Sequence, residues 1–366
     1  MKAWPHGNYG AKLKQEKNDI INFYQNKRVL ITGHTGFKGG WLSLFLKKMG
    51  SEVFGISLDR KNKSIESGFN PSILEQEILT DINNVDSYIN NISKFKPNLV
   101  FYLAAQPLVI EAYNNPVETI KTNVLGLTNF LNAIKGINSI DVILVVTSDK
   151  VYDHNFNDQK FVESDRLGGV EPYGVSKAMQ EMVVKCFYQS YFKSMNKKII
   201  TVRAGNVIGG GDWGKDRLLV DIIKSIDSKQ KMLIRYPKNT RPWQHVIELL
   251  YGYLTLVSKV SKDDIGFESF NFAPEKSYPA EDIIKLSKKY WGNKFDYIIS
   301  DKNHIFEEKK LEISNEKIEN YINWKVEKNL SHTLKETFDW YNDFLNKENM
   351  VEVNNKVIDK CLGIIE

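Results

Sequence analysis

The chain has 366 residues, of which 42% are hydrophobic and 26% are charged, and it carries a formal net charge of +5. These proportions are typical of globular proteins and exclude a largely disordered chain, a collagen-like chain and a long coiled coil. The weak charge, spread over intermixed basic and acidic residues, argues against nucleic-acid binding, and we find no apolar run of about 18 residues that would span a membrane. The sequence shows no readable secretory signal, and Cys186 and Cys361 match no metal or disulfide spacing, so we expect a cytoplasmic protein without a metal site.

Strands and helices are predicted to alternate along the chain. Short apolar, β-branched runs predict strands at 28–32, 53–58, 76–79, 99–103, 142–146 and 199–202. Helical stretches, among them 41–49 and 117–134, lie between these strands. Such a chain folds into a parallel sheet with helices on both faces. We therefore expect a Rossmann-type, doubly wound α/β sheet with a smaller C-terminal substrate-binding lobe.

The domain boundaries follow from the same pattern. Residues 1–26 are polar and Lys-rich, and we expect an N-terminal arm there that is irregular at residues 4–7. We assign 27–204 mainly to a dinucleotide-binding Rossmann domain and 205–346 mainly to the substrate lobe, with some segments interleaved. Past residue 205 glycines and prolines interrupt the strand–helix pattern. Residues 347–366 remain as a C-terminal tail.

The turn after the first predicted strand is rich in glycine. Its sequence, GHTGFKG at 33–39, is a GxxGxxG motif that follows a strand and opens a helix. In this context the glycines give a tight turn and let the backbone approach a pyrophosphate, which N–H groups at the helix start can bind. The cofactor-binding residues predicted here are Gly33, Thr35, Gly36, Phe37, Lys38 and Gly39. The alternative is a glycine turn with a structural role only.

Residues after the next strands bear on the choice of cofactor. Asp59 comes about 20 residues after the glycine motif, where a carboxylate binds a ribose hydroxyl. Its charge would repel a 2′-phosphate, which favours NAD, whereas the neighbouring Arg60 keeps NADP open. Further cofactor-binding residues predicted at strand ends are Asp81, Ile82, Leu103, Ala104 and Ala105. For the alanines, plain packing is the alternative.

The YxxxK sequence at 173–177 contains the residues that we expect to take part in the reaction. Tyr173 and Lys177 lie one helical turn apart, on the same face of a predicted helix. An ammonium near a phenol favours the phenolate and lowers its pKa, so such a tyrosine can take a proton from a carbinol while hydride leaves for nicotinamide. Ser148, just after the predicted strand 142–146, completes the set. The alternative for an isolated YxxxK is a surface helix.

Several motifs together resemble one family. They are TGHTGFKGGWLSLFL (32–46), LAAQPLV (103–109), TNVLG (122–126), TSDKVYD (147–153), EPYGVSK (171–177), RAGNVIGGGDWGKDR (203–217) and RPWQHVIE (241–248). From about residue 26 to about 346 the chain resembles extended short-chain dehydrogenases/reductases that act on nucleotide sugars, and among them the CDP-glucose 4,6-dehydratases. The residues at 151, 174–175 and 178–180 depart from that pattern, which leaves the exact sugar and nucleotide open.

The resemblance implies a reaction and roles for five residues. The reaction is NAD-dependent dehydration of CDP-D-glucose to CDP-4-dehydro-6-deoxy-D-glucose, through C4 oxidation, loss of water across C5 and C6 and hydride return to C6, for deoxysugar or surface-polysaccharide biosynthesis. Tyr173, assisted by Lys177, would take the 4-hydroxyl proton, and Ser148 would bind the C4 oxygen. Asp149 would protonate the leaving 6-hydroxyl, and Lys150 would be the base at C5.

Lys150 can act as a base only when it is neutral, so burial or a nearby cation must lower its pKa. The alternative for Asp149-Lys150 is a salt bridge at the end of the strand. Other functions in view are a nucleotide-sugar epimerase or reductase, a 4,6-dehydratase for another nucleotide sugar, and a non-catalytic NAD-binding relative. The acid–base pair argues against the epimerase or reductase, and the intact Tyr–Lys–Ser set argues against the non-catalytic relative.

The lobe is expected to bind the nucleotide half of the substrate. Guanidinium groups can pair bidentately with phosphates. The predicted substrate-binding residues are Asn206, Arg217, Arg235 and Arg241, with Trp213 and Trp243 as candidate walls of the site. For each isolated Arg or Trp, surface charge or core packing is the alternative. The family resemblance also implies a homo-oligomer, a dimer or a tetramer.

Overall fold

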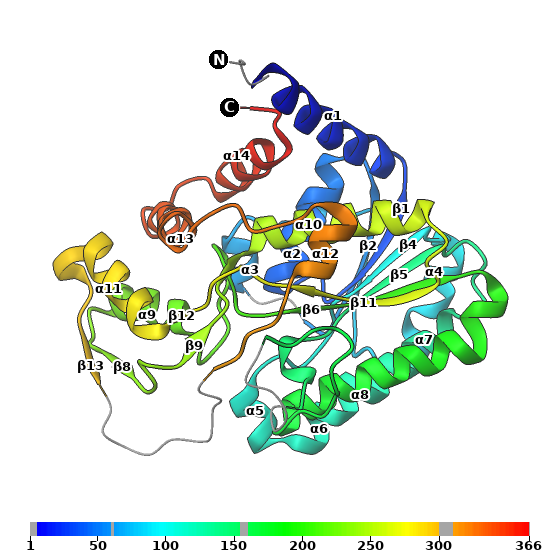
Figure 1. Ribbon diagram of the computed structural model, residues 1–366, viewed down its shortest axis with the longest axis horizontal. Coiled ribbons are helices and arrows are strands. Elements are labelled where there is room, and N and C mark those ends of the chain that lie inside the picture. Colours follow the sequence, from blue (N-terminus) through cyan, green and yellow to red (C-terminus); the bar gives the residue numbers. More distant parts are fainter. Residues whose placement is uncertain (1–5, 60–61, 154–159, 300–309, 366) are drawn as a thin grey trace, which may run out of the picture.

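A seven-stranded parallel sheet forms the centre of the computed structural model, which describes residues 6–59, 62–153, 160–299 and 310–365 (Figure 1). Its strands are β1 (Arg28–Thr32), β2 (Glu52–Ser57), β3 (Gln76–Leu79), β4 (Leu99–Tyr102), β5 (Val142–Val146), β6 (Lys198–Ala204) and β11 (Phe267–Phe272). Their order is β11-β6-β5-β4-β1-β2-β3, and all neighbours are parallel. The order reverses between β1 and β4, and ligands bind at such a switch point, beyond the carboxyl ends of the strands.

Helices cover both faces of the sheet because successive side chains on each strand point to opposite sides. Leu30 and Val100 face a core shared with α4 (Ile89–Phe95), α7 (Gly126–Ile134) and α8 (Pro172–Phe187). Val29 and Leu99 face the other core, which includes α2 (Phe37–Lys48) and α10 (Val246–Lys262). Figure 1 shows the two layers on either side of the strands. The prediction of a doubly wound α/β sheet is confirmed.

The six predicted strands all exist, with small shifts at their ends. The helix predicted at 41–49 is α2, which already begins within the glycine motif. The helix predicted at 117–134 consists of α6 (Pro116–Ile120), a π-helical stretch at Lys121–Leu125 and α7. The seventh strand, β11, comes from the part of the chain assigned mainly to the lobe, so the lobe segment also completes the sheet.

The lobe contains three small sheets of two strands each. The pairs are β7 (Val207–Ile208) with β10 (Gln244–His245), β9 (Thr240–Arg241) with β12 (Tyr278–Pro279), and β8 (Met232–Ile234) with β13 (Tyr297–Ile299). The strands of two of these sheets, β8, β9, β12 and β13, are labelled on the left of Figure 1. Further helices in the described part of 62–345 are α3 (Asn62–Glu66), α5 (Val109–Asn114), α9 (Leu218–Ser228), α11 (Ala280–Trp291), α12 (Glu316–Ile322) and α13 (Leu330–Leu345). No helix in the described ranges combines the length and apolarity needed to cross a membrane.

Both ends of the chain differ from the sequence expectation. The N-terminal segment is not an irregular arm: it contains helix α1 (His6–Tyr24), and the buried Tyr24 donates a hydrogen bond to the carbonyl of Leu254 (2.9 Å). The segment expected as a C-terminal tail contains helix α14 (Met350–Leu362). Its buried Asn354 accepts a hydrogen bond from Trp340 and donates one to the carbonyl of Ser67. These polar anchors explain why neither end is irregular.

Candidate active site

The glycine turn leaves room only for backbone. Gly33 has a φ of +78°, and a Cβ there would lie 3.0 Å from the nitrogen of Ala104. A Cβ on Gly39 would lie 2.2 Å from the carbonyl oxygen of Gly33. Gly36 is the N-cap of α2 and makes no capping side-chain hydrogen bond within the described structure, so the first N–H groups of α2 remain available to an anion. The turn therefore fits the pyrophosphate of a dinucleotide.

Thr35 ties the glycine turn to the end of β2. Its hydroxyl lies 2.8 Å from the hydroxyl of Ser57 and donates to the carbonyl of Asp59 (2.6 Å). Asp59 is exposed at this strand end, as a ribose-binding carboxylate requires. Arg60, which bears on the choice between NAD and NADP, lies outside the described residues.

The residues predicted after β3 and β4 line the same edge of the sheet. The hydroxyl oxygen of Thr32, at the end of β1, lies 3.2 Å and 3.1 Å from the amide nitrogens of Leu103 and Ala104, which holds this backbone next to Gly33. Asp81 is exposed, whereas Ile82 is buried among the core residues of α4 and α7. Ala105, like Leu103 and Ala104, is half-buried.

The side chain of His34 connects the glycine turn to β3, a contact that the sequence did not predict; we call it the His34 clamp. The Nε2 atom of the buried His34 lies 2.6 Å from Oε1 of Glu77 on β3. Its ring crosses β2 at Gly55, where a Cβ would come within 2.5 Å of the ring. Gly55 pairs in register with Ile31 on one side and with Glu77 on the other. His34 therefore connects the glycine turn to β3 across a glycine that leaves room for the ring.

The acid candidate, Asp149, lies in a short 3₁₀ turn directly after β5. Ser148 donates a hydrogen bond to its Oδ1 (3.1 Å), while Oδ2 is buried with no hydrogen-bond partner among the described residues. A Cβ on Gly205 would lie 3.1 Å from Oδ2. The side chain is only 4% exposed, and this burial raises the pKa of Asp149, although Lys150, Ser148 and Arg241 act in the opposite direction. A carboxyl group that stays protonated to a higher pH is suited to donate a proton.

Tyr173 and Lys177 lie on α8 beside this turn. Burial raises the pKa of Tyr173 to about 12, and its hydrogen bond with Ser148 opposes the rise. The sequence predicted a lowered pKa; the structure differs because desolvation outweighs the groups that favour the phenolate. Lys177 donates to the carbonyl of Val146 (3.1 Å) and to Gln180 (2.9 Å), and its Nζ lies 6.0 Å from the Tyr173 ring centre. Burial, followed by the charge of Lys38, lowers the pKa of Lys177 to about 7.

Lys150 faces a carboxylate that sequence reasoning did not single out. Its Nζ lies 4.0 Å from Oε1 of Glu171, which is the N-cap residue of α8. The two side chains are 14% and 4% exposed. The charged partner of Lys150 at this position is thus a carboxylate rather than a cation. The signal in the sequence was an acidic residue just before Pro172, the first residue of the catalytic helix.

Lys38, predicted to bind the cofactor, lies electrostatically close to two aspartates and an arginine. Burial, followed by the charge of Arg217, lowers the pKa of Lys38 to about 8, whereas Asp149 and Asp212 raise it. Lys38 therefore shares the surroundings of the acid candidate. Its neighbour Phe37, the first residue of α2, is half-buried against the core.

The four predicted substrate-binding residues do not share one environment. Arg241 is buried and donates a hydrogen bond to the carbonyl of Thr240 (2.9 Å). Its positive charge acts to lower the pKa of Asp149. Arg217 donates to Asp212 (2.5 Å) and lies close enough to Tyr173 to lower its pKa. A guanidinium nitrogen of Arg235 lies 3.4 Å from a carboxylate oxygen of Asp216. The backbone carbonyl of Asn206 accepts a hydrogen bond from the backbone N–H of Gln244 (3.0 Å).

The two tryptophans proposed as walls are anchored by hydrogen bonds to the protein. The indole N–H of Trp213 donates to Ser67 (2.8 Å), and its ring packs edge-on against Tyr341. The indole N–H of Trp243 donates to the carbonyl of Tyr278 (3.1 Å), and its side chain is buried. Contacts within the protein therefore cover much of the surface of both tryptophan side chains.

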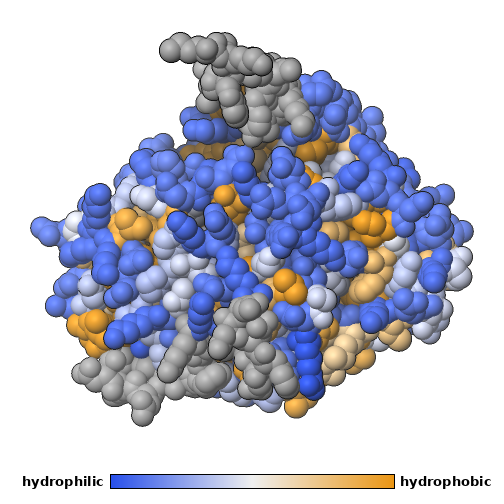
Figure 2. All heavy atoms as spheres, viewed as in Figure 1, coloured by the Kyte–Doolittle hydropathy of each residue, from blue (hydrophilic) through white to orange (hydrophobic). Residues whose placement is uncertain are grey.

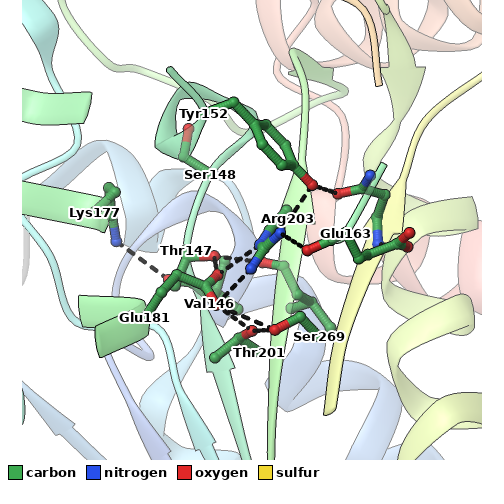
Figure 3. Close-up of polar contacts among 12 residues, drawn as sticks. Val146, Thr147, Ser148, Tyr152, Glu163, Lys177, Glu181, Thr201, Arg203 and Ser269 are labelled. Atoms are coloured by element: carbon green, nitrogen blue, oxygen red, sulfur yellow. Dashed lines mark hydrogen bonds and ion pairs between the residues drawn. The ribbon is translucent and has the colours of Figure 1, made fainter. Parts of the chain in front are cut away.

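A buried ion pair lies beneath the catalytic residues, and Figure 3 shows its surroundings. Arg203 on β6 donates two hydrogen bonds of 3.0 Å to the two carboxylate oxygens of Glu181 on α8. Thr147 and Thr201 donate to the same carboxylate at 2.6 Å and 2.7 Å. Because Thr147 precedes Ser148 and Glu181 lies one turn beyond Lys177, this pair joins the two segments that carry the candidate catalytic residues. Sequence reasoning missed it.

The fold and this cluster together define an extended short-chain dehydrogenase/reductase. A Tyr–Lys pair one turn apart lies beside the end of β5, next to the crevice where a dinucleotide binds. The chain belongs to the family described as GDP-mannose 4,6 dehydratase, whose family model matches residues 30–337. It is 37% identical over 351 residues to CDP-glucose 4,6-dehydratase of Salmonella typhimurium, a match that covers 93% of this chain and 98% of that protein. The resemblance inferred from the motifs is confirmed.

Solved structures show the same fold. An epimerase from Methanothermobacter thermautotrophicus matches with a TM-score of 0.78 at 19% identity, over 94% of this chain and 98% of that one. UDP-glucuronic acid 4-epimerase from Bacillus cereus, solved with UDP-glucuronic acid and NAD, matches with a TM-score of 0.76 at 21% identity, over 86% of this chain and 99% of that one. At these identities the likeness establishes the fold alone.

Proposed function

We propose that the protein is a CDP-glucose 4,6-dehydratase, a hydro-lyase that converts CDP-D-glucose to CDP-4-dehydro-6-deoxy-D-glucose and water. The observation that carries the proposal is Asp149, a buried acid with a raised pKa, which lies between Ser148 and Lys150 beside Tyr173. Dehydration needs one acid and one base beyond the redox pair, and this turn supplies both residue types. The 37% identity to the Salmonella enzyme supports the same conclusion.

The cofactor in this proposal is NAD. The glycine turn has the cradle and the open helix start that a pyrophosphate needs, and Asp59 lies where it can bind the adenosine ribose. Asp81, Ile82 and the half-buried backbone from Leu103 to Ala105 would complete the cofactor site. The chemistry that NAD supplies when bound is removal of a hydride from C4 of the hexose and its return to C6.

Tyr173 would act at C4. Its hydroxyl takes the proton of the 4-hydroxyl group, and Ser148 donates a hydrogen bond to the same substrate oxygen. Tyr173 must be in its phenolate form for this step, and the high pKa of about 12 shows how strongly burial opposes that form. Arg217 supplies nearby positive charge that favours it, and Lys177, whose Nζ lies 6.0 Å from the ring centre, would add to this charge when protonated.

Asp149 and Lys150 would complete the elimination. The C4 ketone acidifies the C5 hydrogen, and the amine of Lys150 would take this proton from its neutral form, although the nearby Glu171 carboxylate favours the ammonium. The electrons of the C5–H bond form the C5–C6 double bond, and the C6–O bond breaks. Protonated Asp149 gives its proton to the departing oxygen, which leaves as water.

The lobe would hold the nucleotide half, while residues 27–204, joined in the sheet by β11, would mainly form the cofactor domain. Arg241 is the main phosphate-binding candidate because it is buried beside the catalytic turn. Arg217 and Arg235 would contribute after exchanging their Asp212 and Asp216 partners, and Asn206 would act close to the diphosphate.

Purified protein incubated with NAD and each of CDP-, dTDP-, GDP- and UDP-glucose tests this function by mass spectrometry. We expect loss of one water from CDP-glucose and no net reduction of the cofactor. Water loss from another nucleotide sugar would reassign the nucleotide. An unchanged mass with every substrate would refute the dehydratase assignment.

The protein is also proposed to act as a homo-oligomer through α8. Val175, Met179 and Met182 are exposed at spacings of four and three residues on one side of this helix, and Val117 and Leu125 are exposed on the preceding helices. Figure 2 shows a mostly hydrophilic face, with a paler orange strip at the lower right where α8 lies in Figure 1. Contiguous apolar surface of this kind supports self-association. Sedimentation equilibrium should give a dimer or tetramer, and Met182→Lys should shift it towards monomer.

A further inference from the structure

Glu171 is the N-cap residue of α8, the helix that carries Tyr173 and Lys177. Its carboxylate accepts hydrogen bonds from the backbone N–H groups of Tyr173 (2.7 Å) and Gly174 (2.8 Å). These are two of the N–H groups that the first turn of any helix leaves without a partner inside the helix. Glu171 is buried, so water does not compete for these bonds. The position of the Tyr173 backbone therefore depends on this one side chain.

The same carboxylate also meets Lys150. Its Oε1 atom, which binds the Gly174 amide, lies 4.0 Å from the Nζ of Lys150. Only 14% of the lysine side chain and 4% of the glutamate side chain are exposed, so solvent screens this pair far less than a surface pair. The side chain of Lys150, which belongs to the 3₁₀ turn after β5, is therefore directed towards the first residues of α8.

Gly174 brings the two backbones together. A Cβ at this position would lie 2.7 Å from the carbonyl oxygen of Lys150 and 3.1 Å from Oε1 of Glu171. Only glycine leaves room for the Lys150 turn to pack this closely on α8.

We propose that Glu171 is the positioning residue for Lys150, holding its amine for the proton at C5 and stabilising the ammonium that forms when this proton is taken. The inference rests on the proposed function, in which Lys150 is the C5 base. A carboxylate fixed beforehand beside a developing positive charge lowers the barrier without reorganising during the reaction. Because the same group caps α8, Glu171 links the residue for C4 oxidation to the residue for C5 deprotonation.

Two variants separate positioning from capping. Glu171→Gln removes the charge but keeps an oxygen for the cap, and Glu171→Asp keeps a charged cap but draws the carboxylate away from Lys150. With CDP-glucose and NAD, C4 oxidation is followed at 340 nm in a single turnover, and deuterium uptake at C5 by mass spectrometry in D₂O. We expect both variants to slow C5 exchange by roughly tenfold to a hundredfold and C4 oxidation by less than about threefold. Glu118→Gln, which removes the exposed partner of Lys121, is the matched control and should change neither rate.

Equal slowing of both steps in the two variants, or wild-type C5 exchange in Glu171→Asp, would overturn the inference, because capping alone would then explain Glu171. Lys150→Ala distinguishes this result from failure of the proposed function. If Lys150→Ala keeps C5 exchange, Lys150 is not the base and the proposed function loses that step. If Lys150→Ala loses exchange while Glu171→Gln keeps it, only the positioning role is wrong.

Discussion

Glu181 and Arg203 form a buried, two-pronged ion pair, with both hydrogen bonds at 3.0 Å, directly beneath the proposed catalytic turn. The pair spans 22 residues of sequence and joins α8 to β6. Removing one partner of such a pair leaves the other charge buried and uncompensated, which typically costs about 3–5 kcal/mol. The link between the catalytic helix and the sheet thus depends on a completed pair.

Glu181→Gln should therefore lower the free energy of unfolding by about 3–5 kcal/mol, as measured by urea denaturation. The exposed pair variant Glu118→Gln should change it by less than about 0.5 kcal/mol. Burial by itself would raise the pKa of Glu181, but Arg203 and the hydroxyls of Thr147 and Thr201 hold it below its usual value of 4.5. A lowered carboxyl pKa stabilises the fold above the unfolded value, and this contribution is lost as pH falls through the folded value. The difference between wild type and variant should accordingly shrink below about pH 4.5, and a constant difference down to pH 3 would contradict this account.

Gly39→Ala should weaken NAD binding by more than about tenfold, because the new Cβ would lie 2.2 Å from the Gly33 carbonyl and the turn must shift. Titration calorimetry with NAD measures the change. Gly136→Ala is the control, since a Cβ there meets nothing within 4 Å. Unchanged affinity in Gly39→Ala would show that the turn does not hold the pyrophosphate.

The His34 clamp predicts a coupled pair of substitutions. Gly55→Ala should destabilise the protein by about 1–3 kcal/mol, because its Cβ overlaps the His34 ring. In a protein that already carries His34→Ala the overlap is gone, so adding Gly55→Ala should change the free energy of unfolding little. Thermal and urea unfolding of all four proteins give the coupling free energy. Additive effects would mean that the ring and Gly55 do not constrain each other.

Tyr173→Phe should lower the rate of C4 oxidation by about 10²–10⁴-fold while the fold is retained, because it removes only the hydroxyl next to Ser148. Absorbance at 340 nm reports this step, and circular dichroism checks the fold. Undiminished turnover would remove the assignment of Tyr173 as the base.

Asp149→Asn should stop water loss but allow deuterium exchange at C5, because an amide cannot protonate the departing hydroxyl whereas Lys150 still removes the C5 proton. Mass spectrometry in D₂O distinguishes the two events in one sample. In wild type the raised pKa of Asp149 predicts that elimination slows as pH rises through that value and the carboxyl group loses its proton. Normal product formation by Asp149→Asn would require another acid.

The candidate catalytic set could be proposed from the sequence because its members are local and because the family resemblance implies roles for Asp149 and Lys150. Tyr173 and Lys177 are one turn apart, and Ser148 to Lys150 are consecutive, so spacing alone puts them at one strand end and one helix start. The partners of these residues could not be predicted. His34 meets Glu77 across 43 residues, and Glu171 meets Lys150 only because α8 packs on the turn after β5. Such pairs depend on strand order and helix packing, which a sequence pattern does not encode.

The pKa of Tyr173 shows the same difference between what local spacing predicts and what tertiary contacts decide. The sequence places Lys177 one turn away, which suggests a lowered value, but burial at the end of β5 dominates and raises it to about 12. The helical ends of the chain were also missed, because the anchors of Tyr24 and Asn354 lie far away along the sequence. Short-range geometry and the strand–helix alternation therefore determined the sheet and the glycine turn, and together with the family resemblance they gave the candidates for the acid, the base and the redox residues. Only the tertiary structure decided which charges and carbonyls surround them, because burial and electrostatics depend on segments that meet after the chain has folded.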